Sequence, residues 1–168
     1  VICQNNGSVL NIGFGMGIID SYIRDLNPDK HSIIEIHPQV VQKAKDMGFE
    51  QTATIYEGDW RIWVDKWRLD GTKFDAIYFD TYSIVEDEWF AFITQVDYIL
   101  NEGGIFCYFN GSAASLGGKN IPMYTKASYG YTAHSKTISA NEIVEAVDGE
   151  FDENLLDKKD YELIWLTK

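Results

Sequence analysis

The residues best suited to chemistry in this sequence follow directly after predicted strands. Asp80 ends the largely apolar run 74–80, and Thr81 and Tyr82 come next. A strand that ends in aspartate places a carboxylate in the crevice at the carboxyl ends of parallel strands. Such a carboxylate can hold a cationic group through charge-assisted hydrogen bonds. The alternative is an aspartate that caps a helix or closes a turn.

A second polar group follows the next predicted strand. Asn110, Gly111 and Ser112 offer an amide, a hydroxyl and backbone N–H groups without a bulky side chain over them. These groups suit the carboxylate of a small substrate. The alternative for Asn110 is a plain turn residue.

Three glycines at alternate positions interrupt the most apolar part of the N-terminal region. The run 9–12 predicts a buried parallel strand, Gly13, Gly15 and Gly17 follow, and helical spacing resumes at Ile18. A ligand can lie directly on the bare N–H groups of such a strand-to-helix turn. Dinucleotide sites space their glycines at i, i+2 and i+5, so the spacing here favours a nucleoside without a pyrophosphate. The alternative is a glycine-rich turn without a ligand.

Glu35, Asp59 and Trp60 follow the second and third predicted strands. Glu35 stands where an α/β nucleoside site places a carboxylate for both ribose hydroxyls. A buried carboxylate with a purely structural role would need a partner, so we favour the ribose role. Trp60 could stack on an adenine while Asp59 or its neighbouring amide meets the exocyclic amine. A capping aspartate and a core tryptophan are the alternative, and both interpretations can hold.

The elements that must position these residues alternate between strand and helix. The predicted strands are 9–12, 31–36, 52–56, 74–80 and 105–109; the predicted helices are 18–25, 38–47, one from 60 through 67, and 86–100. This order indicates a doubly wound, mostly parallel α/β sheet. Beyond it we expect a long loop or lid over 111–137, a short helix over 140–147 and a closing strand over 161–167.

Composition limits the classes of partner. The chain has 168 residues, 45% of them hydrophobic, which is enough for the single domain that we expect over 1–168. A net charge of −12 argues against a nucleic-acid or anionic-membrane partner, whose phosphates would be repelled. The same field would attract a small cation. The alternative is that the acidity only confers solubility.

Cysteine and histidine usage indicates neither disulfides nor a metal. Cys3 and Cys107 are too few for a disulfide framework, so we expect free thiols and a reducing, cytoplasmic location. The three histidines show no metal-ligand spacing, and we expect no metal. The chain starts at Val1 rather than Met, and we expect it to be a piece of a longer protein.

The motifs together resemble a known family. The run 9–20, Val-Leu-Asn-Ile-Gly-Phe-Gly-Met-Gly-Ile-Ile-Asp, resembles the S-adenosylmethionine motif of class I methyltransferases. Segments 35–38, 57–60, 78–82 and 109–111 follow in the order and spacing of the guanidino methyltransferases, which include guanidinoacetate and arginine N-δ-methyltransferases. The similarity spans about residues 8–112 and implies a seven-stranded, Rossmann-like αβα sheet.

The resemblance also implies roles for individual residues. S-adenosyl-L-methionine would be held by Gly13, Phe14, Gly15, Met16, Glu35, Ile36, Asp59, Trp60 and Asp80. The substrate, arginine or a small arginine-like compound, would contact Asp80, Thr81, Tyr82, Asn110, Gly111 and Ser112. Asp80 would be the catalytic residue.

The family also carries a segment before its glycine motif, with a second acidic residue and a lid. This chain begins after that point, so we expect the segment upstream or from a second copy in a homodimer.

Three other functions are consistent with the same residues. A class I methyltransferase could act on another small amine or hydroxyl acceptor. A non-catalytic module could bind S-adenosylmethionine and regulate or scaffold a partner, although such a module has no use for Asp80. An NAD oxidoreductase is disfavoured by the glycine spacing and by the lack of a clear acid or base for hydride transfer.

Overall fold

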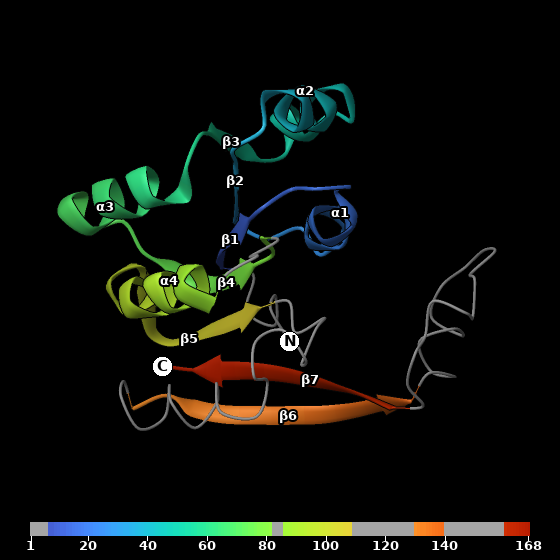
Figure 1. Cartoon of the computed structure of the whole chain (residues 1–168). Coiled ribbons are helices and arrows are strands. Elements are labelled where there is room, and N and C mark those ends of the chain that lie inside the picture. The colour runs from blue at the N-terminus through green and yellow to red at the C-terminus, as the bar shows by residue number, and fades with distance from the viewer. Residues whose placement is uncertain (1–6, 82–85, 109–129, 140–159) are drawn as a thin grey trace.

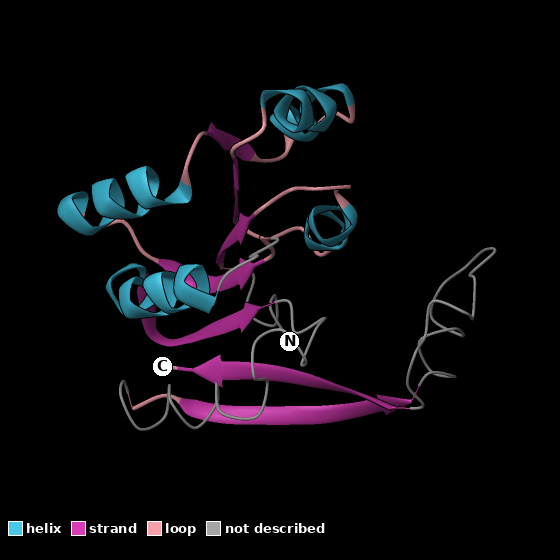
Figure 2. Ribbon diagram, viewed as in Figure 1, coloured by secondary structure: helices cyan, strands magenta, loops and turns pink. Residues whose placement is uncertain are grey.

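The computed structural model describes residues 7–81, 86–108, 130–139 and 160–168 (Figure 1). Helices lie on both sides of one twisted sheet (Figure 2). The strands are β1 (Ser8–Ile12), β2 (Lys30–Glu35), β3 (Thr54–Glu57), β4 (Phe74–Phe79), β5 (Leu100–Tyr108), β6 (Thr132–Ser139) and β7 (Asp160–Thr167). The helices are α1 (Ile18–Asp25), α2 (Pro38–Asp46), the single 3₁₀ turn η1 (Phe49–Gln51), α3 (Trp60–Asp70) and α4 (Glu86–Ile99).

The sheet has the order β3-β2-β1-β4-β5-β7-β6. The first five strands in this order, from β3 through β2, β1 and β4 to β5, are parallel, whereas β7 runs antiparallel to both of its neighbours. The predicted doubly wound, mostly parallel sheet of seven strands is therefore confirmed. After β3 the chain crosses back to place β4 on the other side of β1. This reversal between β1 and β4 is where open α/β sheets bind their ligands.

The larger part of the core lies between the sheet and helices α3 and α4, and it is aromatic. Phe79 of β4 stacks on Phe92 of α4 with ring centroids 4.3 Å apart, and Trp60 meets Phe92 edge-on at 5.2 Å. Smaller clusters cover the opposite face, under α1 and α2. Because Trp60 and Phe79 pack on Phe92, the start of α3 and the end of β4 are held in place by aromatic contacts.

Several predicted boundaries agree closely with the structure, α1 in every residue. Two predictions were wrong. The strand predicted over 105–109 begins earlier, at Leu100, and in this added part the Gly103 N–H donates to the Lys168 carbonyl oxygen and the Lys168 N–H to that of Gly104. The expected loop 111–137 becomes strand β6 at Thr132, because pairing with β7 satisfies its backbone although most side chains from 132 to 137 are exposed.

Part of the predicted loop and the whole predicted helix 140–147 lie outside the described residues. Cys107 is a buried free thiol, and burial raises its pKa to about 12. Cys3 lies outside the described residues. Within the described ranges, we find no helix that is both long and apolar enough to cross a membrane.

Candidate active site

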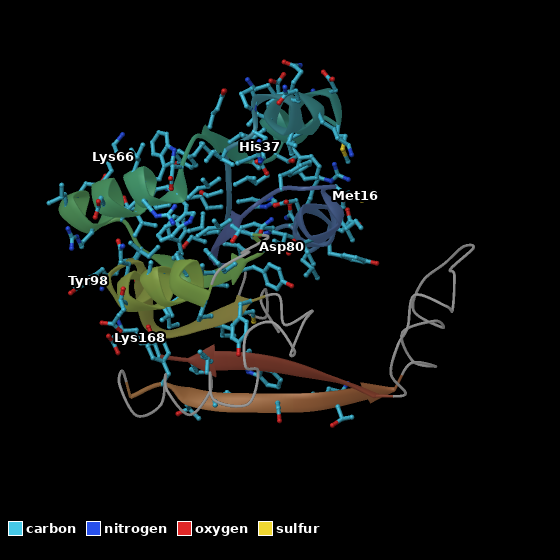
Figure 3. All side chains as sticks on the ribbon, viewed as in Figure 1. Met16, His37, Lys66, Asp80, Tyr98 and Lys168 are labelled. Atoms are coloured by element: carbon cyan, nitrogen blue, oxygen red, sulfur yellow. The ribbon has the colours of Figure 1, made fainter. Side chains whose placement is uncertain are left out.

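A cavity of about 400 Å³ opens at the carboxyl ends of β1 to β4, where the topology reverses. A smaller hollow of about 260 Å³ lies beside it, and the two share Gly15, Asp80 and Thr81. Figure 3 shows His37, Met16 and Asp80 at this end of the sheet, on three different segments. The cavity collects most of the predicted residues: Gly13, Gly15, Glu35, Ile36, Asp59, Trp60, Asp80 and Thr81.

The glycine turn has the close backbone approach that its sequence predicts. Gly13 has φ +97°, and a Cβ there would overlap the carbonyl oxygen of Asp80. Gly17 is the N-cap of α1 with φ +78°, and its N–H donates to the Phe14 carbonyl oxygen at 2.8 Å. A Cβ on Gly15, by contrast, would meet nothing within 4 Å. The turn is thus closely packed at Gly13 and open at Gly15, which leaves room for a flat nucleoside to lie on the backbone.

Glu35 holds this turn from the neighbouring strand. The residue is 5% exposed, and its Oε2 accepts the Phe14 N–H at 2.9 Å and lies 3.5 Å from the Gly15 nitrogen. Oε1 accepts the His37 N–H at 2.8 Å. These bonds are the structural partners that a buried carboxylate needs. Within the part of the chain that the structure describes, Oε1 has only the His37 N–H as a partner and can accept a further hydrogen bond, so a ribose role for Glu35 remains a prediction compatible with this geometry.

Asp59 caps a helix and Trp60 is part of the core, as the structural alternatives for these two residues predicted. Asp59 is the N-cap of α3, where its side chain accepts the Arg61 N–H at 2.8 Å. Trp60 is 6% exposed and packs edge-on against Phe79 at 6.0 Å, with the Arg61 guanidinium 4.6 Å from its ring centroid. Both residues also line the cavity. Their contacts with an adenine remain a prediction.

Asp80 lies at the junction of the two hollows. Its N–H donates to the Ile12 carbonyl oxygen at 2.8 Å, which ties the end of β4 to the end of β1. Burial, and secondly the charge of Asp20, raises the pKa of the Asp80 carboxyl above its usual value. Burial and the charge of Asp80 in turn raise the pKa of the Tyr78 hydroxyl, which therefore stays neutral. The Thr81 hydroxyl oxygen is buried and without a hydrogen-bond partner among the described residues.

The remaining predicted residues lie at the rim or outside the description. Met16 is 71% exposed and lines the smaller hollow with Phe14, whereas Ile36 is 54% exposed at the edge of the larger cavity. Tyr82, Asn110, Gly111 and Ser112 lie outside the described residues. The described ranges contain no cluster of side chains that could hold a metal ion.

Sequence reasoning missed a buried polar network directly beneath the turn. Asn11, Asp20 and His31 come from β1, α1 and β2, and each is at most 4% exposed. The signal in the sequence was an asparagine and a histidine within otherwise apolar strands, together with an aspartate in the first turn of α1. A polar residue in a buried strand needs a partner.

Comparisons with known proteins agree with this geometry. A family model described as guanidinoacetate N-methyltransferase matches residues 1–125. A Candida glabrata protein named protein arginine N-methyltransferase 2 is 43% identical over 109 residues, covering 63% of this chain and 26% of that protein. Its Yarrowia lipolytica namesake is 33% identical over 148 residues, covering 84% of this chain and 31% of that protein. The crystal structure of Aeropyrum pernix fibrillarin with natively bound S-adenosyl-L-methionine has a TM-score of 0.65 at 14% identity, over 99% of this chain and 68% of that one.

The parallel sheet with one reversed strand and a glycine turn after β1 is the architecture of class I S-adenosyl-L-methionine-dependent methyltransferases. Within that class, this chain belongs to the guanidinoacetate N-methyltransferase family. The predictions of class, family and cofactor are thereby confirmed. The chain spans between a quarter and a third of the length of the two curated relatives named above, so the activity of the whole protein is treated below as a proposal.

The role of Glu35 can be tested with a matched pair of substitutions. We expect Glu35→Gln to weaken binding of S-adenosyl-L-homocysteine about ten- to a hundredfold, because a charged acceptor of hydrogen bonds is worth roughly 1.5–3 kcal/mol. Glu57→Gln is the control, since Glu57 is exposed at the end of β3 and directly pairs with Glu35 in the sheet register. Calorimetric titration measures both, and equal affinities for the two variants would contradict the assignment.

Proposed function

We propose that this chain is a methyltransferase domain that binds S-adenosyl-L-methionine at the glycine turn and methylates a guanidino nitrogen of arginine or an arginine-like compound. The observation that carries the proposal is the position of Asp80. This carboxylate is half-buried, lies between two hollows and is fixed beside the glycine turn by backbone contacts. A carboxylate at that point suits a cationic acceptor held next to a cofactor.

A guanidinium is a difficult nucleophile, because its lone pairs are delocalised and the group stays protonated in water. Asp80 can meet this difficulty in two ways. Paired hydrogen bonds from the guanidinium to its two oxygens would fix the plane of the acceptor. The carboxylate would also draw positive charge toward the paired nitrogens and accept the proton that is released.

The bound cofactor would supply a methyl group already activated on a sulfonium sulfur. The protein's task is then to hold the two reactants in line, and positioning of this kind contributes about 7–11 kcal/mol in favourable cases. Gly13, Glu35 and the start of α1 would place the cofactor, while Asp80 and Thr81 would place the acceptor. We also assign Tyr82, Asn110, Gly111 and Ser112 to the acceptor, on the family resemblance alone.

The charge of the chain supports a small cationic substrate. The net charge of −12 raises the local concentration of cations and repels nucleic acids and anionic membranes. The names of the relatives also support arginine as the acceptor. We further propose a reducing, cytoplasmic location, which the buried free thiol of Cys107 supports.

Acceptor binding should depend on pH through Asp80. Only the ionised carboxylate pairs with a guanidinium, and the pKa of Asp80 is raised above 3.8. As pH falls, we therefore expect KM for the acceptor, at saturating cofactor, to rise at a higher pH than an ordinary aspartate would produce. His37 lines the same cavity, so His37→Gln is the control and should leave this acid limb in place. A limb that disappears in His37→Gln would contradict the assignment to Asp80.

Mass spectrometry of reaction products tests the proposed function. The chain is incubated with S-adenosyl-L-methionine and, separately, arginine, an arginine-containing peptide, guanidinoacetate or lysine. Methyl transfer to a guanidino compound but not to lysine supports the proposal. Transfer to lysine alone would assign the domain to another acceptor class, and cofactor binding with no transfer would favour the non-catalytic module.

A further inference from the structure

Three polar side chains are buried together beneath the glycine turn, and none of them lines either hollow. Asn11 and Asp20 are fully buried and His31 is 4% exposed. Their neighbours on the same face of the sheet, such as Val9 and Ile33, are apolar. Stability alone does not require polar side chains here, because replacing buried polar or charged groups by well-packed apolar ones is often neutral or stabilising.

The contacts run in one line from β2 to the turn. His31 Nε2 lies 2.9 Å from Asp20 Oδ1. The Asn11 side-chain amide donates to Asp20 Oδ2 at 2.7 Å and to the Gly13 carbonyl oxygen at 2.9 Å. A carboxylate accepts hydrogen bonds but does not donate them, so Asp20 determines which way the Asn11 amide points. Asp20 thereby directs the second amide hydrogen of Asn11 onto Gly13.

The orientation has a cost that remains visible in the structure. Asn11 Oδ1 and His31 Nδ1 are buried and have no hydrogen-bond partner among the described residues. Unpaired buried polar atoms destabilise a fold. The network therefore keeps its geometry at the expense of stability, which is the pattern expected where a position matters for function.

The Gly13 carbonyl and the Phe14 N–H are the two ends of a single peptide group. That group is planar, so whatever fixes one end fixes the other. Asn11 holds the carbonyl end, and Glu35 Oε2 accepts the N–H end at 2.9 Å. The peptide group between residues 13 and 14 is thus held at both ends. The buried network binds its carbonyl oxygen, and Glu35, the residue predicted to bind the ribose, accepts its N–H.

We propose that Asn11, Asp20 and His31 are positioning residues, which hold the 13–14 peptide so that Glu35 and the glycine turn are set for the cofactor before it binds. The inference rests on the proposed function for the identity of that ligand. It assigns the buried network to cofactor affinity rather than to folding stability. Loss of the network should therefore lower the affinity for the cofactor more than an equally destabilising change elsewhere on the same face of the sheet does.

The matched pair is Asn11→Ala and Ile23→Ala. Ile23 is buried on α1 in the cluster with Val9, and it does not contact the turn residues through any hydrogen bond. Two quantities are measured for each folded variant: the calorimetric affinity for S-adenosyl-L-homocysteine and, without ligand, the hydrogen-exchange rate of the Phe14 amide. We expect Asn11→Ala to lose about tenfold or more in affinity, the equivalent of one hydrogen bond, and to exchange faster at Phe14. Ile23→Ala should resemble the wild type in both.

A second comparison keeps the test decisive if Asn11→Ala does not fold. In Asp20→Asn, the new side-chain amide oxygen can still accept the hydrogen bond from Asn11. Its NH₂ group can donate to His31 Nε2 when the His31 proton is on Nδ1 instead. The alanine of Asp20→Ala can form neither hydrogen bond. We expect Asp20→Asn to retain most of the affinity that Asp20→Ala loses. Equal affinity and equal Phe14 exchange in Asn11→Ala and Ile23→Ala, or no rescue by Asp20→Asn, would overturn the inference. Failure of the wild type to bind the ligand would instead overturn the proposed function, and the exchange measurement would still test the network.

Discussion

Replacing Asp80 with asparagine should lower turnover of a guanidino acceptor by about 10²–10⁴-fold, the range for loss of a positioned proton acceptor. The substitution removes the charge that pairs with the guanidinium and the group that takes up its proton, while the side chain keeps its size. Cofactor affinity should change little, because the backbone contacts of Asp80 with Ile12 and Gly13 remain. Steady-state kinetics and calorimetric titration with S-adenosyl-L-homocysteine measure the two quantities separately.

Asp65→Asn is the control for the change of charge. Asp65 lies on α3 in a solvent-exposed ion pair with Arg68, so its substitution alters the net charge equally but leaves the site intact. We expect near-wild-type turnover for this variant. If Asp80→Asn lost cofactor affinity in proportion to turnover, Asp80 would act through the cofactor alone, and the role assigned to it toward the acceptor would be wrong.

Replacing Gly13 with alanine should abolish measurable binding of the cofactor. The backbone at Gly13 has φ +97°, which L-residues rarely adopt, and a Cβ would overlap the Asp80 carbonyl oxygen. A non-glycine residue in a strained region costs about 1–3 kcal/mol before any overlap is counted, which corresponds to a fall in Tm of roughly 2–12 °C for a domain of this size. Because the displaced atoms belong to the turn and to Asp80, the site is disrupted together with stability.

Gly48→Ala separates these two effects. Gly48 also has positive φ, +80°, but a Cβ there would meet nothing within 4 Å. This variant should show the backbone strain alone, with a smaller loss of Tm and unchanged cofactor affinity. Thermal melts and calorimetry on both variants test the comparison. Equal losses in the two would show that the overlap with Asp80 has no effect.

The sequence predicted most of the parallel half of the sheet and the residues at its edge. The apolar run before Gly13, the glycine-to-helix transition and Asp80 after an apolar strand are local signals, and the topology brings the ends of these strands together. The start of β5 and strand β6 could not be predicted in this way. The start of β5 pairs with Phe74 of β4 and, through Gly103 and Gly104, bonds to Lys168 just after β7, and β6 pairs with β7. These contacts are non-local, and the exposed side chains of β6 show no clear alternation.

The part of the site that pattern reasoning missed is also non-local. Asn11, Asp20 and His31 are separate exceptions to the hydrophobic pattern, and only the fold shows that they meet. The opposite held for Trp60, whose burial follows from its place on the apolar face of α3. That packing supports one of the two roles given to Trp60 and leaves its contact with the cofactor to experiment.

Calorimetric titration with S-adenosyl-L-homocysteine, repeated with arginine and then guanidinoacetate present, tests the central claim most directly. A shared site between the two hollows predicts that the chain binds the cofactor product and that one guanidino compound changes this affinity, because the two ligands meet at Asp80. The same guanidino compound should have no effect in Asp80→Asn. Absence of cofactor binding, or cofactor binding that responds to neither guanidino compound, would contradict the account.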